Sequence, residues 1–270
     1  MLKILYRVYA FLFSRTFFTR FNLFVYHLAL RGLGVMNYQN FITSGEKYVL
    51  KRFIKGQKPI VIDIGANEGK YAQLVKSVHP ESKVFSFEPH PKNFFKLQEN
   101  ARHSGFMAFN LALDKSAGSV LLYDYQDMDG SPHASIYKGV IEDVQKGIAV
   151  GQHVSTTSLD IFFAKHLLVD ENIDLLKIDA EGNELNILVG GQRFLSENRI
   201  KMIQFEFSQL NIISRTFLKD FFDFLKQYNF YRILRCGLIP LDPYDPTNCE
   251  IYLFQNILAI HKRYLAEVFR

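Results

Sequence analysis

Short apolar segments rich in β-branched residues alternate with helix-like segments between residues 59 and 260, and this alternation restricts the chain to few folds. Strands that alternate with helices of about ten residues form βαβ units and build a mostly parallel sheet. Such a sheet binds its ligands outside the carboxyl ends of its strands. We therefore predict an α/β protein whose functional residues lie where the strands end.

The predicted elements divide the chain into two parts. Strands are predicted at 59–64, 83–88, 107–113, 173–179 and 200–207, with an edge strand at 118–125 and last strands at 231–234 and 251–260. Helices are predicted at 45–55, 68–78, 91–101, 184–195 and 217–228. Residues 1–44 form a basic and aromatic helical extension, and residues 45–262 form one domain.

The first predicted strand ends in a glycine turn that leads directly into a helix. Glycine lets the backbone turn sharply and approach a ligand closely. A dinucleotide loop of the G-x-G-x-x-G type would carry glycine at Asn67 and would bring a pyrophosphate near the negative charge of Glu68. S-adenosylmethionine has no phosphate and carries positive charge, so it fits this loop better. The predicted cofactor residues of the loop are Asp63, Gly65, Ala66, Asn67 and Gly69.

Glu88 ends the second predicted strand, 23 residues after Gly65, and Pro89 follows it. A carboxylate at this position can accept both ribose hydroxyls of a nucleoside, as in dinucleotide folds. Proline cannot continue the hydrogen-bond ladder, so Pro89 fixes the end of the strand. We assign Glu88 and Pro89 to the cofactor site, although a glycine turn and a strand-ending acid each also occur for structural reasons alone.

A third segment is polar where a buried strand should be apolar. Lys177 lies within the predicted strand, Asp179 ends it, and Glu181 and Glu184 follow. A buried lysine or carboxylate is costly unless it is paired. These side chains therefore face a polar site or one another. The structural alternative is an ion pair of Lys177 followed by acids at a helix N-terminus, where the helix dipole favours them.

Three segments together resemble the FkbM family of S-adenosylmethionine-dependent methyltransferases. They are Val61-Ile62-Asp63-Ile64-Gly65-Ala66-Asn67-Glu68-Gly69, Phe87-Glu88-Pro89 and Leu176-Lys177-Ile178-Asp179-Ala180-Glu181-Gly182-Asn183-Glu184. The resemblance extends from about residue 45 to residue 260, and the third segment is its most distinctive part. It implies a Rossmann-like class I methyltransferase fold, with a mostly parallel seven-stranded sheet, an antiparallel last strand and helices on both faces. It also implies O-methylation, often of sugars in glycans or natural products.

The candidate acceptor residues follow from these motifs. Asp179 or Glu181 would orient the acceptor or take its proton, and Glu206, near the end of another strand, is a second candidate base. Lys177 is a candidate substrate contact. His133 and Ser135 are also candidate substrate contacts, because they lie in a turn-rich loop that can cover the site. Taken alone, His133 is more typical of an ordinary loop histidine. Carboxylates at strand ends can bind a divalent cation, but the motif lacks a dedicated ligand spacing, and we predict no metal.

The net charge of +5 comes from the N-terminus. Five basic residues precede the first acidic residue, Glu46, and residues 32–270 contain 27 basic and 27 acidic side chains. A nucleic-acid-binding domain would carry its positive charge on the folded body. We therefore predict no nucleic-acid partner.

The N-terminal segment, residues 1–31, combines these basic residues with many aromatic side chains. Lys3, Arg7, Ala10 and Ser14 are spaced so that one helix would carry them as a less apolar stripe. Such a helix suits a membrane interface, and the alternatives are packing on its own domain or on a second subunit in a homodimer.

The cellular location follows from what the sequence lacks. Arg7 interrupts the N-terminal apolar stretch, and the longest uncharged run there, residues 21–30, is about half of what a membrane-spanning helix needs. Two cysteines are too few for a disulfide framework. We predict a cytoplasmic protein, with peripheral contact at the inner face of the membrane as the alternative.

The predicted function is S-adenosylmethionine-dependent methylation of a hydroxyl on a sugar, a glycan or another small molecule. An oxidoreductase that binds NAD(P) or a nucleotide sugar on a similar sheet is one alternative. A non-catalytic protein that binds membrane surfaces through residues 1–31 is the other. The sequence leaves the identity of the methyl acceptor open.

Overall fold

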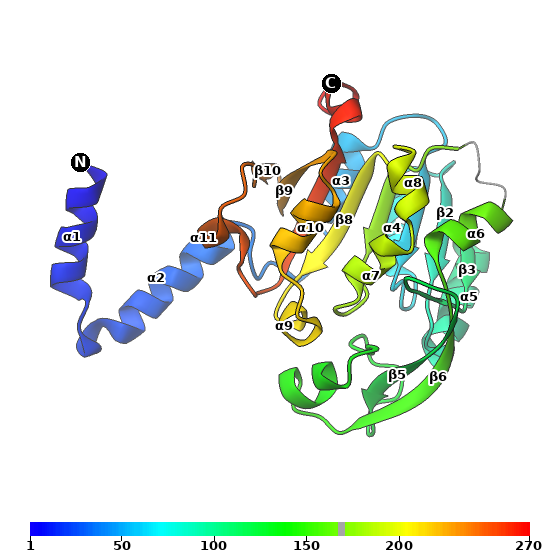
Figure 1. Ribbon diagram of the computed structural model, residues 1–270, viewed down its shortest axis with the longest axis horizontal. Helices are drawn as coiled ribbons and strands as arrows, with labels where there is room; N and C mark the ends of the chain where they lie inside the picture. The colour runs from blue at the N-terminus through cyan, green and yellow to red at the C-terminus, as the bar shows by residue number, and fades with distance from the viewer. Residues whose placement is uncertain (167–170) are drawn as a thin grey trace.

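The computed structural model describes residues 1–166 and 171–270, and its centre is an eight-stranded sheet (Figure 1). Across the sheet the strands follow the order β10-β9-β11-β8-β7-β1-β2-β3. Their bounds are β1 Ile60–Ile64, β2 Lys83–Phe87, β3 Met107–Phe109, β7 Leu175–Ile178, β8 Met202–Phe207, β9 Tyr228–Leu234, β10 Gly237–Pro240 and β11 Gln255–His261.

Strand directions in this sheet define the fold. β3, β2, β1, β7 and β8 pair in parallel, and β11 inserts antiparallel between β8 and β9. This is the order of a class I methyltransferase sheet with its reversed last strand, so the predicted fold class is confirmed. The expected strand number was one too low, because the chain turns back after Leu234 and adds β10 at the edge, with Gly237 opposite Leu234.

Helices cover both faces of the sheet, as the alternation of side chains requires. Ile60, Ile62 and Ile64 of β1 pack into one apolar core, and Val61 packs into the other. The first core contains α6 Leu159–Lys165, α7 Glu184–Val189, α8 Gln192–Ser196 and α10 Leu218–Phe224. The second contains α3 Glu46–Phe53, α4 Lys70–Val78, α5 Pro91–Ser104 and α12 Leu265–Val268.

A second, three-stranded sheet lies beside the carboxyl edge of the main sheet (Figure 1). It consists of β4 Ala112–Leu113, β6 Ala149–Thr157 and β5 Gly118–Tyr125, in that order. Two sequence predictions are corrected here. The strand expected at 107–113 is divided between the two sheets, because Asn110 turns back to donate hydrogen bonds to the carbonyls of Glu88 and Pro89. The segment 118–125 pairs within the second sheet and not at the edge of the first.

Three other expected elements have different bounds. The helix predicted at 184–195 is divided into α7 and α8 at Gly190, where a Cβ would lie 2.3 Å from the carbonyl oxygen of Asp114. The helix predicted at 217–228 ends at Phe224, and the strand predicted at 251–260 begins only at Gln255. The remaining short elements are a π-helical turn Val140–Val144, α9 Leu210–Ser214, α11 Pro246–Cys249 and a 3-10 turn Lys262–Tyr264.

Two N-terminal helices extend away from the rest of the molecule (Figure 1). They are α1 Leu2–Phe13 and α2 Thr19–Gly32, joined by the 3-10 turn Thr16–Phe18, and we call residues 1–32 the N-terminal arm. The arm joins the body where Val35 pairs with Gln255. Within the described ranges, no helix is long and apolar enough to cross a membrane. The division at residues 44 and 45 stays a prediction.

Candidate active site

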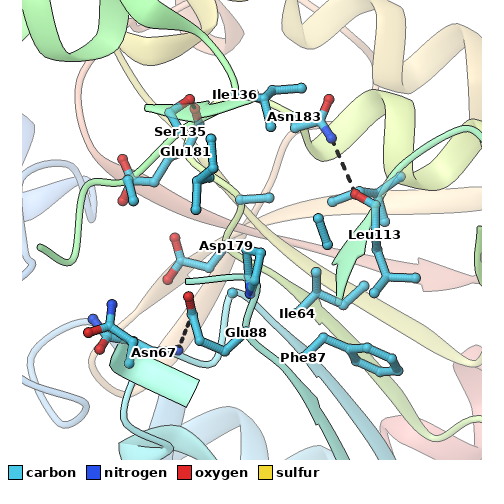
Figure 2. Close-up of a pocket in the computed structure, with 18 of the residues that line it drawn as sticks. Ile64, Asn67, Phe87, Glu88, Leu113, Ser135, Ile136, Asp179, Glu181 and Asn183 are labelled. Carbon is cyan, nitrogen blue, oxygen red and sulfur yellow. Dashed lines mark hydrogen bonds between the residues drawn. The ribbon is translucent and has the colours of Figure 1, made fainter. Parts of the chain in front are cut away.

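A pocket opens at the carboxyl edge of the main sheet, where the motifs of the sequence meet (Figure 2). It holds about 610 Å³ of empty space, including space open to solvent. Its walls come from the ends of β1, β2 and β7, from β4 and from the loop 131–136. The lining residues are Ile64, Gly65, Asn67, Phe87, Glu88, Pro89, Asn93, Leu111, Ala112, Leu113, Leu122, Ser131, Pro132, Ala134, Ser135, Ile136, Asp179, Ala180, Glu181, Asn183 and Ile187.

The backbone of the turn after β1 requires glycine at position 65. Gly65 has a φ of 74°, and a Cβ on it would lie 1.7 Å from the backbone oxygen of Asp179. Only glycine fits this contact, which lets the turn after β1 touch the turn after β7. The backbone amides of Gly65 and Ala66 both donate to the carbonyl of Phe87, so the same turn is also tied to β2.

Glu88 is held by backbone amides on both sides. Its Oε2 accepts from the amide of Asn67 at 2.8 Å (Figure 2). Its Oε1 accepts from the amide of His90, also at 2.8 Å. Only 6% of the residue is exposed, and this burial raises its pKa to about 7. Each carboxylate oxygen keeps a free lone pair. Glu88 can therefore accept hydrogen bonds from two hydroxyls of a ligand in the pocket.

The predicted cofactor residues occupy two layers. Gly65, Asn67, Glu88 and Pro89 line the pocket. Asp63, Ala66 and Gly69 do not line it within the described structure, and Asp63 is fully buried. A Cβ on Gly69 would lie 2.7 Å from the side chain of Leu97, so this glycine serves the packing of α4 against α5.

Lys177 links the buried layer to the pocket. Its Nζ lies 3.1 Å from Asp179 Oδ2 and 3.6 Å from Asp63 Oδ1, and it sits over the ring of Tyr71. Burial alone would lower the pKa of Lys177, but the charges of Asp179 and Asp63 raise it above its usual value. Lys177 is therefore a paired cation that positions Asp179, and its predicted contact with the substrate stays a prediction.

The turn after β7 presents Glu181 to the site. Glu181 itself has a φ of 50°, an unusual backbone conformation for a residue with a side chain. Two contacts hold it: Glu184 Oε1 accepts from the amides of Ala180 and Gly182, and the hydroxyl of Ser135 donates to the carbonyl of Glu181 at 2.8 Å. Ser135, a predicted substrate contact, thus lines the pocket and also fixes the backbone of a predicted catalytic residue.

A second, wider cleft adjoins the pocket and holds about 1190 Å³ of empty space, solvent included. Glu181 lines both cavities and so marks their junction. The cleft brings together the predicted residues His133, Glu181 and Glu206. Its full lining is Met36, Tyr38, His133, Gln145, Glu181, Glu206, Ser208, Gln209, Leu210, Leu253 and Phe254.

Two acids and a histidine meet in this cleft. Burial, followed by the charge of Asp179, raises the pKa of both Glu181 and Glu206, and the charge of Glu181 adds to the effect on Glu206. His133 Nδ1 lies 3.8 Å from Glu181 Oε1, and burial lowers the pKa of His133. A cluster of ionisable groups with shifted pKa values marks a candidate site for proton transfer.

Several lining residues were not found from the sequence. Asn183 is one of them, and its position inside the third motif could have indicated that it lines the pocket. Its Nδ2 donates to the carbonyl of Leu113 at 3.3 Å. Tyr38 and Phe254 come from segments far apart in the chain, and their rings meet edge to face in the lining of the cleft. No local pattern marks these two aromatic residues, because only the fold brings them together.

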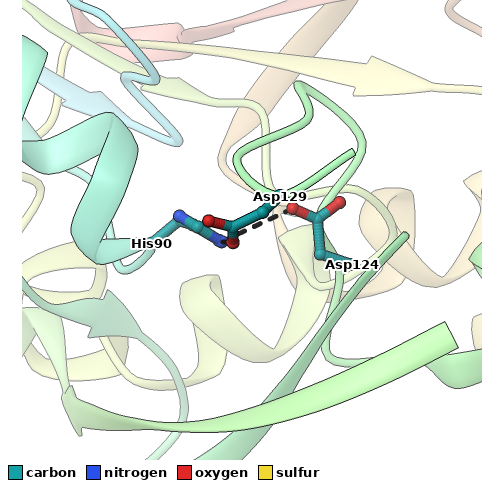
Figure 3. Close-up of side chains that lie close together, drawn as sticks. All are labelled: His90, Asp124 and Asp129. Carbon is teal, nitrogen blue, oxygen red and sulfur yellow. Dashed lines mark ion pairs between the residues drawn. The ribbon is translucent and has the colours of Figure 1, made fainter. Parts of the chain in front are cut away.

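The side chains of His90, Asp124 and Asp129 form a separate cluster (Figure 3). His90 Nε2 is 3.1 Å from Asp129 Oδ1 and 3.4 Å from Asp124 Oδ2. His90 Nδ1 accepts from the amide of Lys92, so we assign the ring proton to Nε2, facing the acids. Asp124 also accepts from the amides of Gly130 and Ser131. The cluster therefore fastens the loop over the pocket to the start of α5.

The fold and the site define an α/β protein with a nucleoside-sized pocket beside an acidic cleft. The model of the family described as "Methyltransferase FkbM domain" matches residues 63–231, more than half of the chain. The chain belongs to this family of methyltransferases, as the sequence motifs predicted.

Individual relatives are more distant. The 2-O-methyltransferase NoeI of Sinorhizobium fredii is 26% identical over 163 residues, which cover 56% of this chain and 65% of NoeI. The methyltransferase sdnD of Sordaria araneosa is 27% identical over 157 residues, covering 49% of this chain and 60% of that protein. The chain thus spans less than two thirds of either relative. The solved structure of methyltransferase FkbM from Methylobacillus flagellatus aligns with a TM-score of 0.47 at 14% identity, covering 76% of this chain and 44% of that one.

Proposed function

We propose that this protein transfers the methyl group of S-adenosylmethionine to a hydroxyl oxygen of a sugar or glycan. One observation carries the proposal: the charged residues among the described lining of the pocket are all acidic, and one of them, Glu181, also lines a second cleft. Such an arrangement suits a cationic cofactor in the pocket and a neutral, hydroxyl-bearing acceptor in the cleft.

The charge of the pocket distinguishes between cofactors. Among the described lining residues, Glu88, Asp179 and Glu181 are acidic and none is lysine or arginine. A dinucleotide would place two phosphates against these carboxylates without a basic partner, which favours S-adenosylmethionine over NAD(P) or a nucleotide sugar. The pocket wall near Phe87, Leu111 and Leu113 is apolar and suits the adenine ring.

In this proposal the pocket residues bind the cofactor and the cleft residues bind the acceptor. Glu88 would bind the ribose hydroxyls, and the turn 65–67 would contact the amino-acid part of the cofactor. When bound, S-adenosylmethionine would supply a sulfonium methyl group: the acceptor oxygen would bond to the methyl carbon as the carbon–sulfur bond breaks, and the electron pair of that bond would stay on sulfur. Positioning that oxygen accounts for much of the rate.

The acceptor hydroxyl must also lose its proton. Glu181 lies at the junction of the two cavities, and Glu206 and His133 lie in the cleft beside it. We assign Glu181 as the group that takes the proton, with the charges of Asp179 and Glu184 adding to burial in raising its pKa, and with Asp179 orienting the acceptor. The name of NoeI, a 2-O-methyltransferase, supports a hydroxyl acceptor.

The proposal is tested with methyl-labelled S-adenosylmethionine and a protein-free extract of cellular glycans and glycolipids. Label that appears in the extract and resists mild alkali is a methyl ether, as O-methylation of a hydroxyl requires. Label released by alkali as methanol would be a methyl ester and would contradict the hydroxyl acceptor. The Glu181→Gln variant, which keeps the shape of the side chain, should transfer far less label than the matched exposed variant Glu99→Gln.

A further inference from the structure

The N-terminal arm exposes apolar side chains that a folded protein in water normally covers. No residue of α1 is buried, and α2 buries only Leu30. Phe11 is 76% exposed and Phe24 is 60% exposed. The exposed large apolar residues of the arm are Met1, Leu2, Ile4, Leu5, Tyr6, Val8, Tyr9, Phe11, Leu12, Phe17, Phe21, Leu23, Phe24, Val25, Tyr26 and Leu28. A continuous apolar surface of this kind marks an interaction site.

Side-chain contacts fix the bend between α1 and α2 in the arm. The hydroxyl of Tyr9 donates to Asn22 Oδ1 at 2.7 Å, and Asn22 Nδ2 donates to the carbonyl of Phe13 at 3.0 Å. The ring of Phe13 packs against those of Phe18 and Phe21. These contacts join α1 to α2, so the two helices present their surfaces in a fixed arrangement.

Each helix of the arm carries a narrow polar stripe on an otherwise apolar surface. In α1 the stripe contains Lys3 and Arg7, four residues apart. In α2 it contains Arg20, His27 and Arg31, which recur at helical spacing. A broad apolar surface with a basic stripe is typical of helices that lie in the plane of a membrane interface.

Charge identifies the partner of the arm. Lys3, Arg7, Arg15, Arg20 and Arg31 lie in the arm, and the first acidic residue of the chain is Glu46. A second copy of this chain would bring five more positive charges against the same surface, which opposes pairing of two arms. A bilayer that contains anionic lipid supplies both negative charge for the stripe and an apolar layer for the aromatic residues.

The arm also ends beside the proposed acceptor cleft. Its junction with the body runs through Val35 and Met36, and the amide of Met36 donates to the carbonyl of Phe254 at 2.7 Å. Met36, Tyr38 and Phe254 all line the cleft. A surface that binds the arm therefore lies next to the cleft.

We propose that the N-terminal arm binds the surface of a bilayer containing anionic lipid and holds the Glu181–Glu206 cleft at that surface. The methyl acceptor is then a lipid-anchored molecule whose hydroxyl-bearing head group enters the cleft from the bilayer. The acceptor class rests on the proposed function, whereas the binding of the arm to membranes does not.

Flotation of the full-length protein with vesicles tests the docking surface. Vesicles of phosphatidylcholine with phosphatidylglycerol should carry the protein, and binding should fall when salt is raised, because salt screens the basic residues. Phe11→Ser with Phe24→Ser should reduce binding about tenfold or more, because two exposed aromatic anchors are lost. The matched control is Phe95→Ser with Phe217→Ser, which removes two exposed phenylalanines of the body.

A fluorescent probe tests where the cleft lies. The exposed Cys236 is first replaced by serine, and an environment-sensitive dye is attached either at Gln209→Cys, on the rim of the cleft, or at Glu81→Cys, at the opposite edge of the sheet. On the same anionic vesicles the emission at position 209 should shift to the blue, while emission at position 81 should not change.

The outcomes separate this inference from the proposed function. Equal flotation of the arm variant and the body control, or no flotation of the wild type, overturns the membrane surface. Loss of a dimer in the arm variant by light scattering, without vesicle binding by the wild type, assigns the arm to a second copy and also overturns it. A blue shift at position 81 alone overturns the placement of the cleft. Neither vesicle experiment requires the cofactor, so failure of the proposed function would be seen separately, as absent binding of S-adenosylhomocysteine.

Discussion

The pocket and the cleft that meet at Glu181 use the same kind of side chain in two different ways. In the pocket, Glu88 is fixed by two backbone amides, so its carboxylate is a rigid acceptor. In the cleft, the pKa of Glu181 and of Glu206 is raised by burial and by nearby carboxylates. Burial raises the pKa of all three groups, but the two backbone amides oppose the shift at Glu88, whereas neighbouring carboxylates add to it at Glu181 and Glu206. A fixed, amide-bound acceptor suits binding and orientation, and carboxylates that repel one another suit proton transfer. The comparison predicts that substitutions on the two sides have separable effects.

The largest effect is expected on turnover when Glu181 becomes glutamine. We expect a fall of about 10²–10⁴-fold in methyl transfer, the usual contribution of a general base, with little change in cofactor affinity. Turnover and calorimetric binding of S-adenosylhomocysteine are measured on the same preparation, with Glu99→Gln as the exposed control. Parallel loss of both in Glu181→Gln would place Glu181 in the cofactor site and remove the distinction between the two sides.

The pH dependence of turnover tests the same role of Glu181. Because the pKa of Glu181 is raised, wild-type turnover should increase as pH rises and Glu181 loses its proton. Asp179→Asn removes a neighbouring negative charge, which should lower the pKa of Glu181 and move the increase to lower pH. An unchanged profile in Asp179→Asn would show that the charge of Asp179 does not act on Glu181.

A smaller effect, on binding, is expected in the pocket. Glu88→Ala removes the acceptor of two hydroxyl hydrogen bonds and should weaken S-adenosylhomocysteine by about 10–100-fold. Calorimetry measures the change, and thermal unfolding checks that the loop 65–67 is still formed. The assignment of Glu88 to the ribose is wrong if the affinity of the folded variant equals that of the wild type.

The contact between the turn after β1 and the turn after β7, both in the pocket, is tested at Gly65. Gly65→Ala would bring a Cβ to within 1.7 Å of the backbone of Asp179, whereas Gly56, which also has a positive φ, has no neighbour within 4 Å. Both variants strain the backbone, so the difference between them isolates the contact, and we expect Gly65→Ala to be about 1–3 kcal/mol less stable than Gly56→Ala. Equal free energies of unfolding in denaturant titrations would show that the two turns are not in contact.

The smallest effect concerns Glu184, beneath the turn that presents Glu181. Burial raises its pKa from a usual value of 4.5 to about 7, so the folded protein binds more protons than the unfolded chain between these values. Stability therefore falls as pH rises through this window. Glu184→Gln keeps an acceptor for the amides and should reduce the fall by about 1 kcal/mol. Melting temperatures at pH 5 and pH 8 check this, and the same pH dependence in the variant as in Glu99→Gln would contradict it.

Much of the fold and of the cofactor side could be predicted from the sequence. Glycine turns, strand-ending acids and alternating apolar residues are local signals, and they located Gly65, Glu88 and Asp179 at one edge of one sheet. The family model confirms the predicted family.

The second sheet and most of the cleft could not be predicted in the same way. The break after β3 depends on contacts of Asn110 with Glu88 and Pro89, more than twenty residues earlier in the chain. The cleft depends on Tyr38 and Phe254, which lie at opposite ends of the sequence. Long-range contacts of this kind leave no periodic pattern for a sequence to display.

The most direct test of the central claim is calorimetric titration of the purified full-length protein with S-adenosylhomocysteine, with NAD⁺ as the control ligand. The acidic pocket predicts micromolar binding of S-adenosylhomocysteine and no heat from NAD⁺. Tight binding of NAD⁺ without a response to S-adenosylhomocysteine would contradict the proposed cofactor and would restore the oxidoreductase alternative.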